Sequence, residues 1–262
     1  MPVVRNIARE RLERGELSLG AGIRMVRGVE IGKAMKSAGY DWLFVDLEHG
    51  ALSIESASQI CLAALDAGIA PIVRIPNGEF SIATRLMDNG ALGIVVPHVD
   101  TAEEARLIVQ KLRYPPIGHR AIFSSVPQYD FRTMNAADMA ALNAANLIVV
   151  MLESREGLEN AAEIAAVPGV DVLLIGTNDL CVELGITGEL GHAKVDDAYV
   201  RVISASRAYG KWPGMGGIYD EQLMRRYILM GARFILAGGD LGFLLEGAGK
   251  RAGFLRSIQN ST

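Results

Sequence analysis

The chain has 262 residues, of which 50% are hydrophobic and 21% charged, so it can bury one large core or two modest ones and lacks the composition of a disordered protein. Its formal net charge of −4 provides no basic face for phosphates, which argues against nucleic acid as a partner. No segment reaches the ~18 consecutive apolar residues of a membrane span, and residues 1–15 lack the apolar stretch of a signal peptide.

Short apolar runs bounded by glycine, proline or charged residues predict eight strands. In chain order they are residues 17–22, 42–46, 71–75, 93–97, 147–153, 170–175, 212–217 and 233–237. Amphipathic segments between them predict helices, among them 31–38, 54–67, 80–89 and 101–111, and Thr101 with Glu104 forms a capping-box pattern at the start of the last one. The seventh strand has the weakest pattern, because Pro213 and three glycines lower its strand propensity.

Strand and helix alternate eight times over the length typical of a (β/α)₈ barrel, and no linker rich in proline or serine divides the chain. We therefore expect an α/β fold with one TIM-barrel domain over residues 1–262. The longest irregular stretch, residues 114–134, is typical of a lid or binding loop. The tail after Gly242 is apolar on one side and could cover its own barrel or a neighbour's.

Polar residues follow the predicted strands at their carboxyl ends, where the active sites of such barrels lie. The second strand ends in Asp46 and His49, the third in Arg74, the fourth in Pro97 and His98 and the fifth in Glu153; the sixth continues through Gly176, Thr177 and Asn178 to Asp179, and the eighth reaches Asp240. We expect these residues to surround one site, in which Pro97, His98 and residues 176–178 help to bind the substrate.

Glu153 and Asp179 end neighbouring apolar strands, so their carboxylates would share one space and repel each other without a cation. Oxygen ligands of this kind suit Mg²⁺ or Mn²⁺. The alternative is that Asp179 caps the next helix and that Glu153 pairs with Arg155 in solvent.

Arg74 closes an apolar strand, where a charged side chain needs a partner. A guanidinium can bind the carboxylate of a 2-oxo acid through two parallel hydrogen bonds, or it can form a structural salt bridge with a core carboxylate. His49 can act as a general base, as the imidazole side chain often does in enzymes, although an isolated histidine is more often structural.

Cys61 and Cys181 are the only cysteines and lie in apolar stretches without the spacing of a zinc or redox site. This usage fits a reduced compartment. We expect a cytoplasmic protein with neither a membrane nor a nucleic acid as partner.

Six motifs in order make the chain resemble the class II pyruvate-dependent aldolases, the HpcH/HpaI or 2,4-dihydroxyheptenedioate aldolase family, which includes 2-dehydro-3-deoxyglucarate aldolase. The likeness runs nearly end to end. It is carried by Asp46-Leu47-Glu48-His49-Gly50, Pro71-Ile72-Val73-Arg74, Val96-Pro97-His98-Val99, Tyr114-Pro115-Pro116-x-Gly118-x-Arg120, Leu152-Glu153-Ser154-Arg155-Glu156 and Ile175-Gly176-x-x-Asp179-Leu180.

The resemblance implies a barrel that assembles as a homo-hexamer, a dimer of trimers, with C-terminal helices exchanged between neighbours. It implies a divalent ion, Mg²⁺, Mn²⁺ or Co²⁺, on Glu153 and Asp179, chelated by the keto and carboxylate oxygens of pyruvate. Arg74 would contact the keto oxygen. His49 would serve in acid-base chemistry, supported by Asp88, and Asp46 lies beside it in the motif.

The predicted activity is reversible cleavage of a 4-hydroxy-2-oxo acid to pyruvate and an aldehyde through an enolate, as in the catabolism of aromatic or sugar acids. A metal ion and Arg74 would neutralise the enolate, and no lysine ends a strand to form a Schiff base instead. The chain departs from the family at Met151, where glutamine is frequent, and at Ala121 after Arg120, where glycine is usual. These departures concern the surroundings of the metal pair and the preference for the aldehyde.

Two other functions fit a barrel of this kind. An acyl-CoA lyase related to the citrate lyase β subunit would need a basic patch for nucleotide phosphates, and Arg225-Arg226 is the nearest approach to one. A barrel without catalysis could serve as a binding or assembly module, but loss of Arg74, Glu153 or Asp179 would then be expected, and all three are present.

Overall fold

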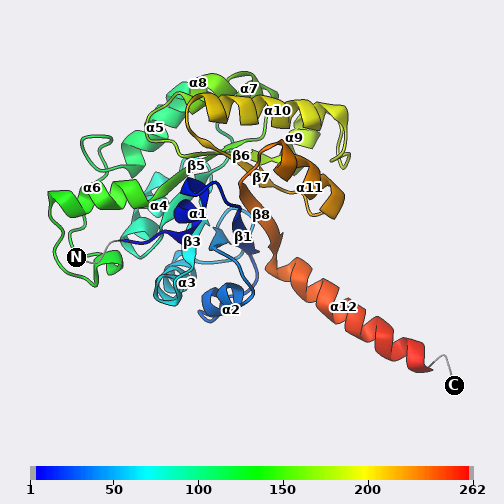
Figure 1. Ribbon diagram of the computed structural model, residues 1–262. Coiled ribbons are helices and arrows are strands. Elements are labelled where there is room, and N and C mark those ends of the chain that lie inside the picture. The colour runs from blue at the N-terminus through cyan, green and yellow to red at the C-terminus, as the bar shows by residue number, and fades with distance from the viewer. Residues whose placement is uncertain (1–3, 260–262) are drawn as a thin grey trace.

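The computed structural model describes residues 4–259, which contain a closed barrel of eight parallel strands (Figure 1). Each strand pairs with the next one along the chain, and the last pairs with the first. The predicted TIM barrel is confirmed, including its weakly patterned seventh strand. The strands are β1 Ser18–Ile23, β2 Trp42–Asp46, β3 Ala70–Arg74, β4 Gly93–Val96, β5 Leu147–Leu152, β6 Val172–Gly176, β7 Trp212–Gly216 and β8 Phe234–Gly239.

Helices surround the barrel. The predicted capping box is confirmed: the Thr101 hydroxyl accepts from the Glu104 N–H (3.2 Å), and the Glu104 carboxylate accepts from the Thr101 N–H (3.0 Å). The helices are α1 Ile7–Glu13, α2 Ile31–Ser37, α3 Ile54–Ala67, α4 Phe80–Asp88, α5 Ala102–Leu112, α6 Ala136–Ala145, α7 Arg155–Glu159, α8 Ala161–Ala165, α9 Thr177–Glu183, α10 Ala193–Ala208, α11 Glu221–Met230 and α12 Asp240–Gln259, with a 3₁₀ turn η1 Pro127–Tyr129.

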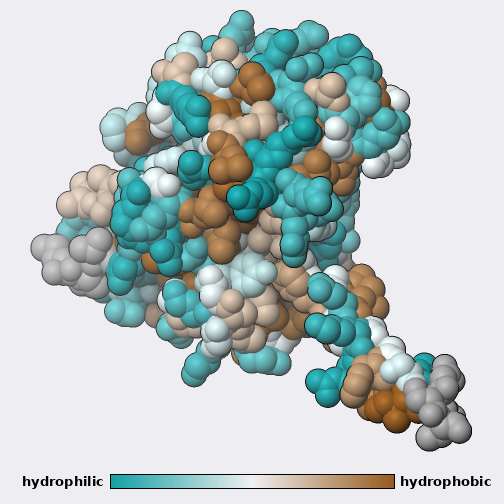
Figure 2. All heavy atoms as spheres, turned by 45° about the vertical axis from the view of Figure 1, so that its right-hand side comes forward, coloured by the Kyte–Doolittle hydropathy of each residue, from teal (hydrophilic) through white to brown (hydrophobic). Residues whose placement is uncertain are grey.

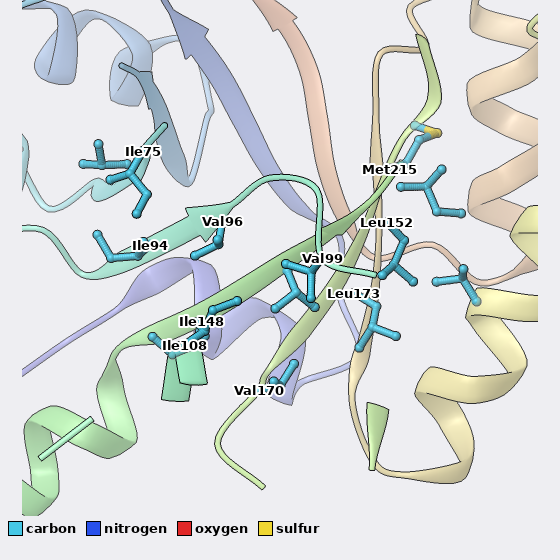
Figure 3. Close-up of a cluster of buried hydrophobic side chains, with 14 of the residues drawn as sticks. Ile75, Ile94, Val96, Val99, Ile108, Ile148, Leu152, Val170, Leu173 and Met215 are labelled. Carbon is cyan, nitrogen blue, oxygen red and sulfur yellow. The ribbon is translucent and has the colours of Figure 1, made fainter. Parts of the chain in front are cut away.

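Side chains alternate between two cores along each strand, because successive residues of a strand point to opposite faces. Outward residues pack against the helices, and Figure 3 shows part of this layer, with Ile94, Ile148 and Leu173 from three strands and Ile108 from α5. Inward residues fill the barrel. They include Trp42, Phe44, Val149, Met151, Leu174, Phe234 and Leu236.

Glycines leave room for the large side chains inside the barrel. A Cβ at Gly20 would lie 2.3 Å from the Trp42 ring, which stacks on Phe234 with ring centroids 4.0 Å apart. On β7, a Cβ at Gly214 would lie 2.9 Å from the Leu174 side chain. The low strand propensity of β7 is therefore outweighed by close packing against β6, with which it pairs from end to end.

Residues 114–134 lie at the amino-terminal end of the barrel. They follow the end of α5, and within them Arg120 pairs with Asp88 and the Gln128 amide donates to the carbonyls of Met87 and Ala91, just before β4 begins. Within one chain the segment does not reach the carboxyl ends of the strands. This stretch is therefore not a lid over the active site of its own barrel, and a binding role elsewhere stays a prediction.

The last helix, α12, projects away from the barrel, and its main contacts within the chain are with β8 and β1 (Figure 1). Apolar side chains are exposed along it, as Figure 2 shows. They include Leu241, Leu244, Leu245, Phe254, Leu255 and Ile258. Despite this apolar character, neither α12 nor another helix within residues 4–259 is both long and apolar enough to cross a membrane.

Candidate active site

The alternation of the strands aims the predicted site residues at one space. Asp46 follows the inward Phe44 on β2, and Glu153 follows the inward Met151 at the end of β5. Asp46 is in register with Arg74 on β3. A cavity of about 230 Å³ lies at this end of the barrel. It is lined by His49, Arg74, Glu153, Gly176, Thr177, Asn178 and Asp179, among other residues.

Arg74 is buried and anchored by two carboxylates. Its Nε and Nη2 donate to Asp46 at 2.9 and 2.6 Å, and its Nη1 lies 3.0 Å from the Glu48 carboxylate. The guanidinium also lies over the Phe44 ring, 5.1 Å from its centroid. The structural salt bridge considered from the sequence is therefore present, and Arg74 still lines the cavity.

Asp46 is fully buried and remains charged. Burial alone would raise its pKa, but the hydrogen bonds and charge of Arg74, together with Arg24 Nε at 2.7 Å, hold the pKa of Asp46 at about 2. Its carboxylate also accepts from the backbone N–H groups of Glu48 and His49, at 3.1 and 3.3 Å. Asp46 is thus the buried anion that organises the residues around it.

His49 lies at the mouth of the cavity with its side chain 56% exposed. Its Nε2 is 3.9 Å from the Glu48 carboxylate, which is too long for a hydrogen bond. The imidazole is therefore free to meet a ligand that enters the cavity.

Glu153 is buried, and its two carboxylate oxygens differ in their hydrogen bonding. One carboxylate oxygen, Oε2, accepts from the His98 N–H at 3.1 Å and lies 3.4 Å from His98 Nδ1, whereas Oε1 has no hydrogen-bond partner among the described residues. Burial and the nearby charge of Asp179 raise the pKa of Glu153 to about 7, despite the His98 N–H. The pairing with Arg155 in solvent is excluded by this burial.

The space around Oε1 is kept open by a glycine. A Cβ at Gly176 would lie 2.0 Å from Glu153 Oε1. Asp179, in the first turn of α9, shares the cavity, and Gly176 at the start of that helix receives no side-chain cap. A partnerless buried carboxylate oxygen beside a second carboxylate, with room left in front of it, fits a hard dication.

Such an ion would need further ligands. Within the part of the chain that the structure describes, no cluster of three or more histidine, cysteine, aspartate or glutamate side chains could hold a metal. The two carboxylates of Glu153 and Asp179 alone do not fill a coordination shell, so water or substrate oxygens would have to complete it.

Three further predicted residues take different places. Pro97 is buried after β4 and does not line the cavity. His98, with a left-handed φ of 50°, reaches the site through its contacts with Glu153. The Thr177 hydroxyl lies 3.0 Å from the Tyr199 hydroxyl, a bond that fixes the start of α9.

Asp88 and His49 lie at opposite ends of the barrel within one chain. Asp88 ends α4, which runs back from the carboxyl end of β3, and it lies five residues before β4 begins, beside Arg120. Burial raises the pKa of Asp88 although Arg120 opposes the shift. If Asp88 supports His49, as the family resemblance implies, the two residues must come from different chains.

Two polar residues that line the cavity, Arg24 and Tyr219, were not predicted from the sequence. Arg24 directly follows β1 and points into the barrel, as Gly22 and Gly20 do two and four residues earlier. The strand predicted from the sequence ends at Gly22 and so does not reach Arg24. Tyr219 follows β7 and lies close enough to Arg24 for the guanidinium to lower its pKa, although burial raises the pKa of this phenol overall. The period-two alternation of β1 was a signal that could have identified Arg24.

Comparisons with known proteins agree with this geometry. The family model described as HpcH/HpaI aldolase/citrate lyase matches residues 30–246. The chain is 36% identical over 264 residues to a 4-hydroxy-4-methyl-2-oxoglutarate aldolase of Hapsidospora irregularis, covering 99% of this chain and 98% of that protein. It is 37% identical over 216 residues to the 5-keto-4-deoxy-D-glucarate aldolase of Escherichia coli strain K12, covering 82% and 83%.

A solved structure is similar throughout. The crystal structure of an HpcH/HpaI aldolase from Desulfitobacterium hafniense DCB-2 superposes with a TM-score of 0.89 at 30% sequence identity, covering 95% of this chain and 96% of that one. The residues from β2 to β8 that line the cavity lie inside the family match at 30–246, whereas Arg24 lies before it.

Proposed function

The chain belongs to the HpcH/HpaI aldolase/citrate lyase family and is a carbon–carbon lyase that cleaves 4-hydroxy-2-oxo acids to pyruvate and an aldehyde, and we propose that it does so with a divalent cation held by Glu153 and Asp179. The family and the aldolase activity predicted from the motifs are confirmed. The ion, its identity among Mg²⁺, Mn²⁺ and Co²⁺, and the roles of single residues belong to the proposal.

The observation that carries the proposal is the unpartnered oxygen of Glu153. A buried carboxylate oxygen without a donor costs free energy unless a ligand satisfies it. When bound, a divalent ion would act as a Lewis acid on the keto group of the substrate. Holding that ion is the role we assign to the two carboxylates.

Arg74 supplies positive charge where negative charge develops. Cleavage removes the C4 hydroxyl proton, breaks the C3–C4 bond and leaves its electron pair as the enolate of pyruvate. Of the five N–H groups of Arg74, two donate to Asp46 and one on Nη1 faces Glu48, which leaves one on each Nη for the enolate oxygen. Because Asp46 fixes the guanidinium before the substrate arrives, little reorganisation is needed during the reaction.

His49 is the proposed acid-base group. In cleavage its imidazole accepts the C4 hydroxyl proton, and a proton is then delivered to C3 of the enolate to form the methyl group of pyruvate. Its exposure at the mouth suits this role, because the departing aldehyde leaves through the same opening.

The floor of the cavity is apolar, with Phe44, Met151, Leu174 and Leu236 below the charged residues. Met151 stands where glutamine is frequent in the family, so this position offers no strong hydrogen bond to a water molecule. A floor of this kind strengthens the electrostatic interactions of Arg74 and the two carboxylates.

Metal-dependent exchange of the pyruvate methyl protons tests the proposal. Protein stripped of metal and placed in D₂O with pyruvate is expected to show exchange by proton NMR only after Mg²⁺, Mn²⁺ or Co²⁺ is added, because enolate formation is the shared half of every reaction of this class. The assay needs no knowledge of the aldehyde. Full exchange in the presence of EDTA would contradict the metal, and no exchange with any ion would contradict the pyruvate enolate.

We propose in addition that α12 is exchanged between neighbouring barrels in a homo-hexamer, a dimer of trimers. The support is its apolar surface, which is exposed in the single chain: Phe254, Leu255 and Ile258 are each more than half exposed. Burying a side chain of this size stabilises an assembly by about 1.5–3 kcal/mol. Packing against the barrel of a neighbouring subunit would bury the apolar side chains of α12 that stay exposed in the single chain.

Replacing Phe254 and Leu255 together with glutamate is therefore expected to lower the molar mass measured by light scattering after gel filtration. The matched control replaces Lys250 and Arg251, exposed polar residues of the same helix, with glutamate and should keep the wild-type mass. A wild-type protein that elutes as a monomer would contradict the hexamer.

We also propose a reducing compartment, the cytoplasm. Both cysteines, Cys61 and Cys181, are unpaired and buried. Burial raises the pKa of Cys61 to about 12 and also raises that of Cys181, which disfavours the reactive thiolate form of both residues. This usage of cysteine fits a protein that is not stabilised by disulfides.

A further inference from the structure

Arg24 stands at the mouth of the active site. It directly follows β1 and points to the same inner face of the barrel as Gly20 and Gly22. Its side chain is 50% exposed. It lines the 230 Å³ cavity that holds Arg74, Glu153 and Asp179. It also lines a second, larger cavity of about 550 Å³ that opens beside the start of α12.

The position of Arg24 is fixed by two buried carboxylates. Its Nε donates to Asp46 Oδ2 at 2.7 Å. Its backbone N–H and those of Met25 and Val26 all donate to Asp240 Oδ2, at 3.1, 2.8 and 2.8 Å. Since Asp240 is 9% exposed and Asp46 is fully buried, the loop and the side chain are both held in place before a ligand binds.

The far end of the guanidinium is free. No hydrogen bond from Nη1 or Nη2 of Arg24 to another residue exists within residues 4–259. These two nitrogens carry four N–H groups in one plane, and their end-on edge matches the two oxygens of a carboxylate. Arg24 therefore offers a prepared binding edge at the cavity mouth.

Arg24 shares its side-chain anion with a second guanidinium group. Asp46 pairs with both Arg24 and Arg74, and Arg74 already fits it through two hydrogen bonds. Asp46 therefore does not use up the binding capacity of Arg24. Tyr219 lines both cavities beside Arg24, and its phenol O–H is an additional donor there.

We propose that Arg24 binds the distal carboxylate of a dicarboxylic 4-hydroxy-2-oxo acid and so sets the preference for such substrates over those with a neutral end. Arg74 would face the pyruvate half and Arg24 the other half across the bond that breaks. This inference rests on the proposed aldol cleavage and names the residue that selects among its substrates. The C3–C4 bond breaks as before, and the released aldehyde carries a carboxylate instead of a neutral group.

A merely structural role for Arg24 makes a different prediction. If Arg24 only helps to hold Asp46, its loss should slow all substrates by the same factor. If it only attracts anions to the surface, the neighbouring Arg27 should contribute equally. Arg27 is exposed, lies in the same loop, donates to the Ala51 carbonyl at 3.3 Å and lines neither cavity.

The experiment compares two substrates that differ only at the proposed contact. They are 4-hydroxy-2-oxoglutarate, which releases glyoxylate, and 4-hydroxy-2-oxopentanoate, which releases acetaldehyde and in which a methyl group replaces the distal carboxylate. The kcat/KM of each is measured for the wild type, Arg24→Gln, Arg24→Lys and the matched control Arg27→Gln, all loaded with the ion that supports pyruvate exchange. The quantity of interest is the ratio of the two kcat/KM values.

We expect Arg24→Gln to lower the preference for the dicarboxylate by about 30-fold or more, because a charged hydrogen-bonded pair is lost. Arg24→Lys should fall in between, since it keeps the charge without the planar edge. Arg27→Gln should keep the wild-type ratio.

An Arg24→Gln ratio equal to that of the wild type, with both substrates slowed alike, overturns the proposal, and so does an equal change in Arg27→Gln. Arg24→Lys keeps the test decisive if Arg24→Gln does not fold. Wild-type protein that exchanges no pyruvate protons with any ion would instead mark failure of the aldolase mechanism itself, and the inference would fall with it.

Discussion

Glu153→Gln is expected to abolish the metal-dependent reaction, with a loss of at least about 10³-fold in kcat, because several kcal/mol of transition-state stabilisation depend on the ion. Glutamine has the shape of glutamate without its charge, so Asp179 would be the only carboxylate left among the described residues that line the cavity. The Kd for Mn²⁺, measured by titration calorimetry, should rise at least about tenfold. The variant should also show no pyruvate methyl exchange.

The same substitution should make the metal-free protein more stable at pH 8. The pKa of Glu153 is raised from its ordinary value of 4.5 to about 7 in the folded state. The wild type therefore loses stability as the pH rises from 4.5 through 7. Glutamine does not ionise, so its free energy of unfolding, measured in urea with EDTA, should exceed that of the wild type by on the order of 1–3 kcal/mol.

Two comparisons isolate the carboxylate. Gly176→Ala keeps Glu153 but places a methyl group against Oε1, and it should also weaken Mn²⁺ binding. Glu156→Gln removes an exposed carboxylate of α7 and should change neither binding nor turnover. Undiminished turnover of Glu153→Gln in EDTA would be incompatible with a metal on this residue.

Much of the site could be predicted because the sequence pattern of a barrel strand indicates where the strand ends and which way its side chains point. A continuous apolar run that ends in a charged residue places that residue at the carboxyl end, and alternation aims it inward or outward. Asp46, Arg74 and Glu153 each follow this rule, and each points into the barrel. The motifs then supplied the family, which the comparisons confirm.

The remaining features depend on tertiary structure. Arg24 was not predicted because glycines at positions 20 and 22 obscure the inward row of β1. Only tertiary contacts explain these glycines: a Cβ at Gly20 would meet the Trp42 ring, and a Cβ at Gly22 would lie 3.2 Å from the Gly238 carbonyl oxygen. Asp88 and the loop after α5 were associated with the site by motif alone. Both come at the ends of helices that run back from the carboxyl ends of the strands, so both lie at the opposite end of the barrel. Motifs taken in chain order carry no information about this direction.

Arg74→Ala is expected to lower kcat/KM for aldol cleavage by about 10²–10³-fold, the usual loss when one preorganised donor to a developing oxyanion is removed. A loss of less than about tenfold, roughly 1.4 kcal/mol, would contradict the role of Arg74 at the enolate. Arg74→Lys keeps the charge but cannot bind Asp46 through two parallel bonds, so it should recover only part of the activity. Arg85→Ala, at an exposed position of α4, is the control.

Arg74→Ala should also destabilise the protein, by about 3–5 kcal/mol at pH 7, because Asp46 would stay buried with only Arg24 as a charged partner. The pH dependence identifies the cause. In the wild type the pKa of Asp46 is about 2, below its ordinary value of 3.8, so its contribution is present above pH 4 and is lost as the pH falls through 2. Without Arg74 the pKa of Asp46 must rise, and the difference in unfolding free energy between the two proteins should shrink as the pH is lowered from 5 to 2. A difference that stays constant over this range would show that the lost stability comes from packing of the Arg74 side chain over Phe44 rather than from the charge of Asp46.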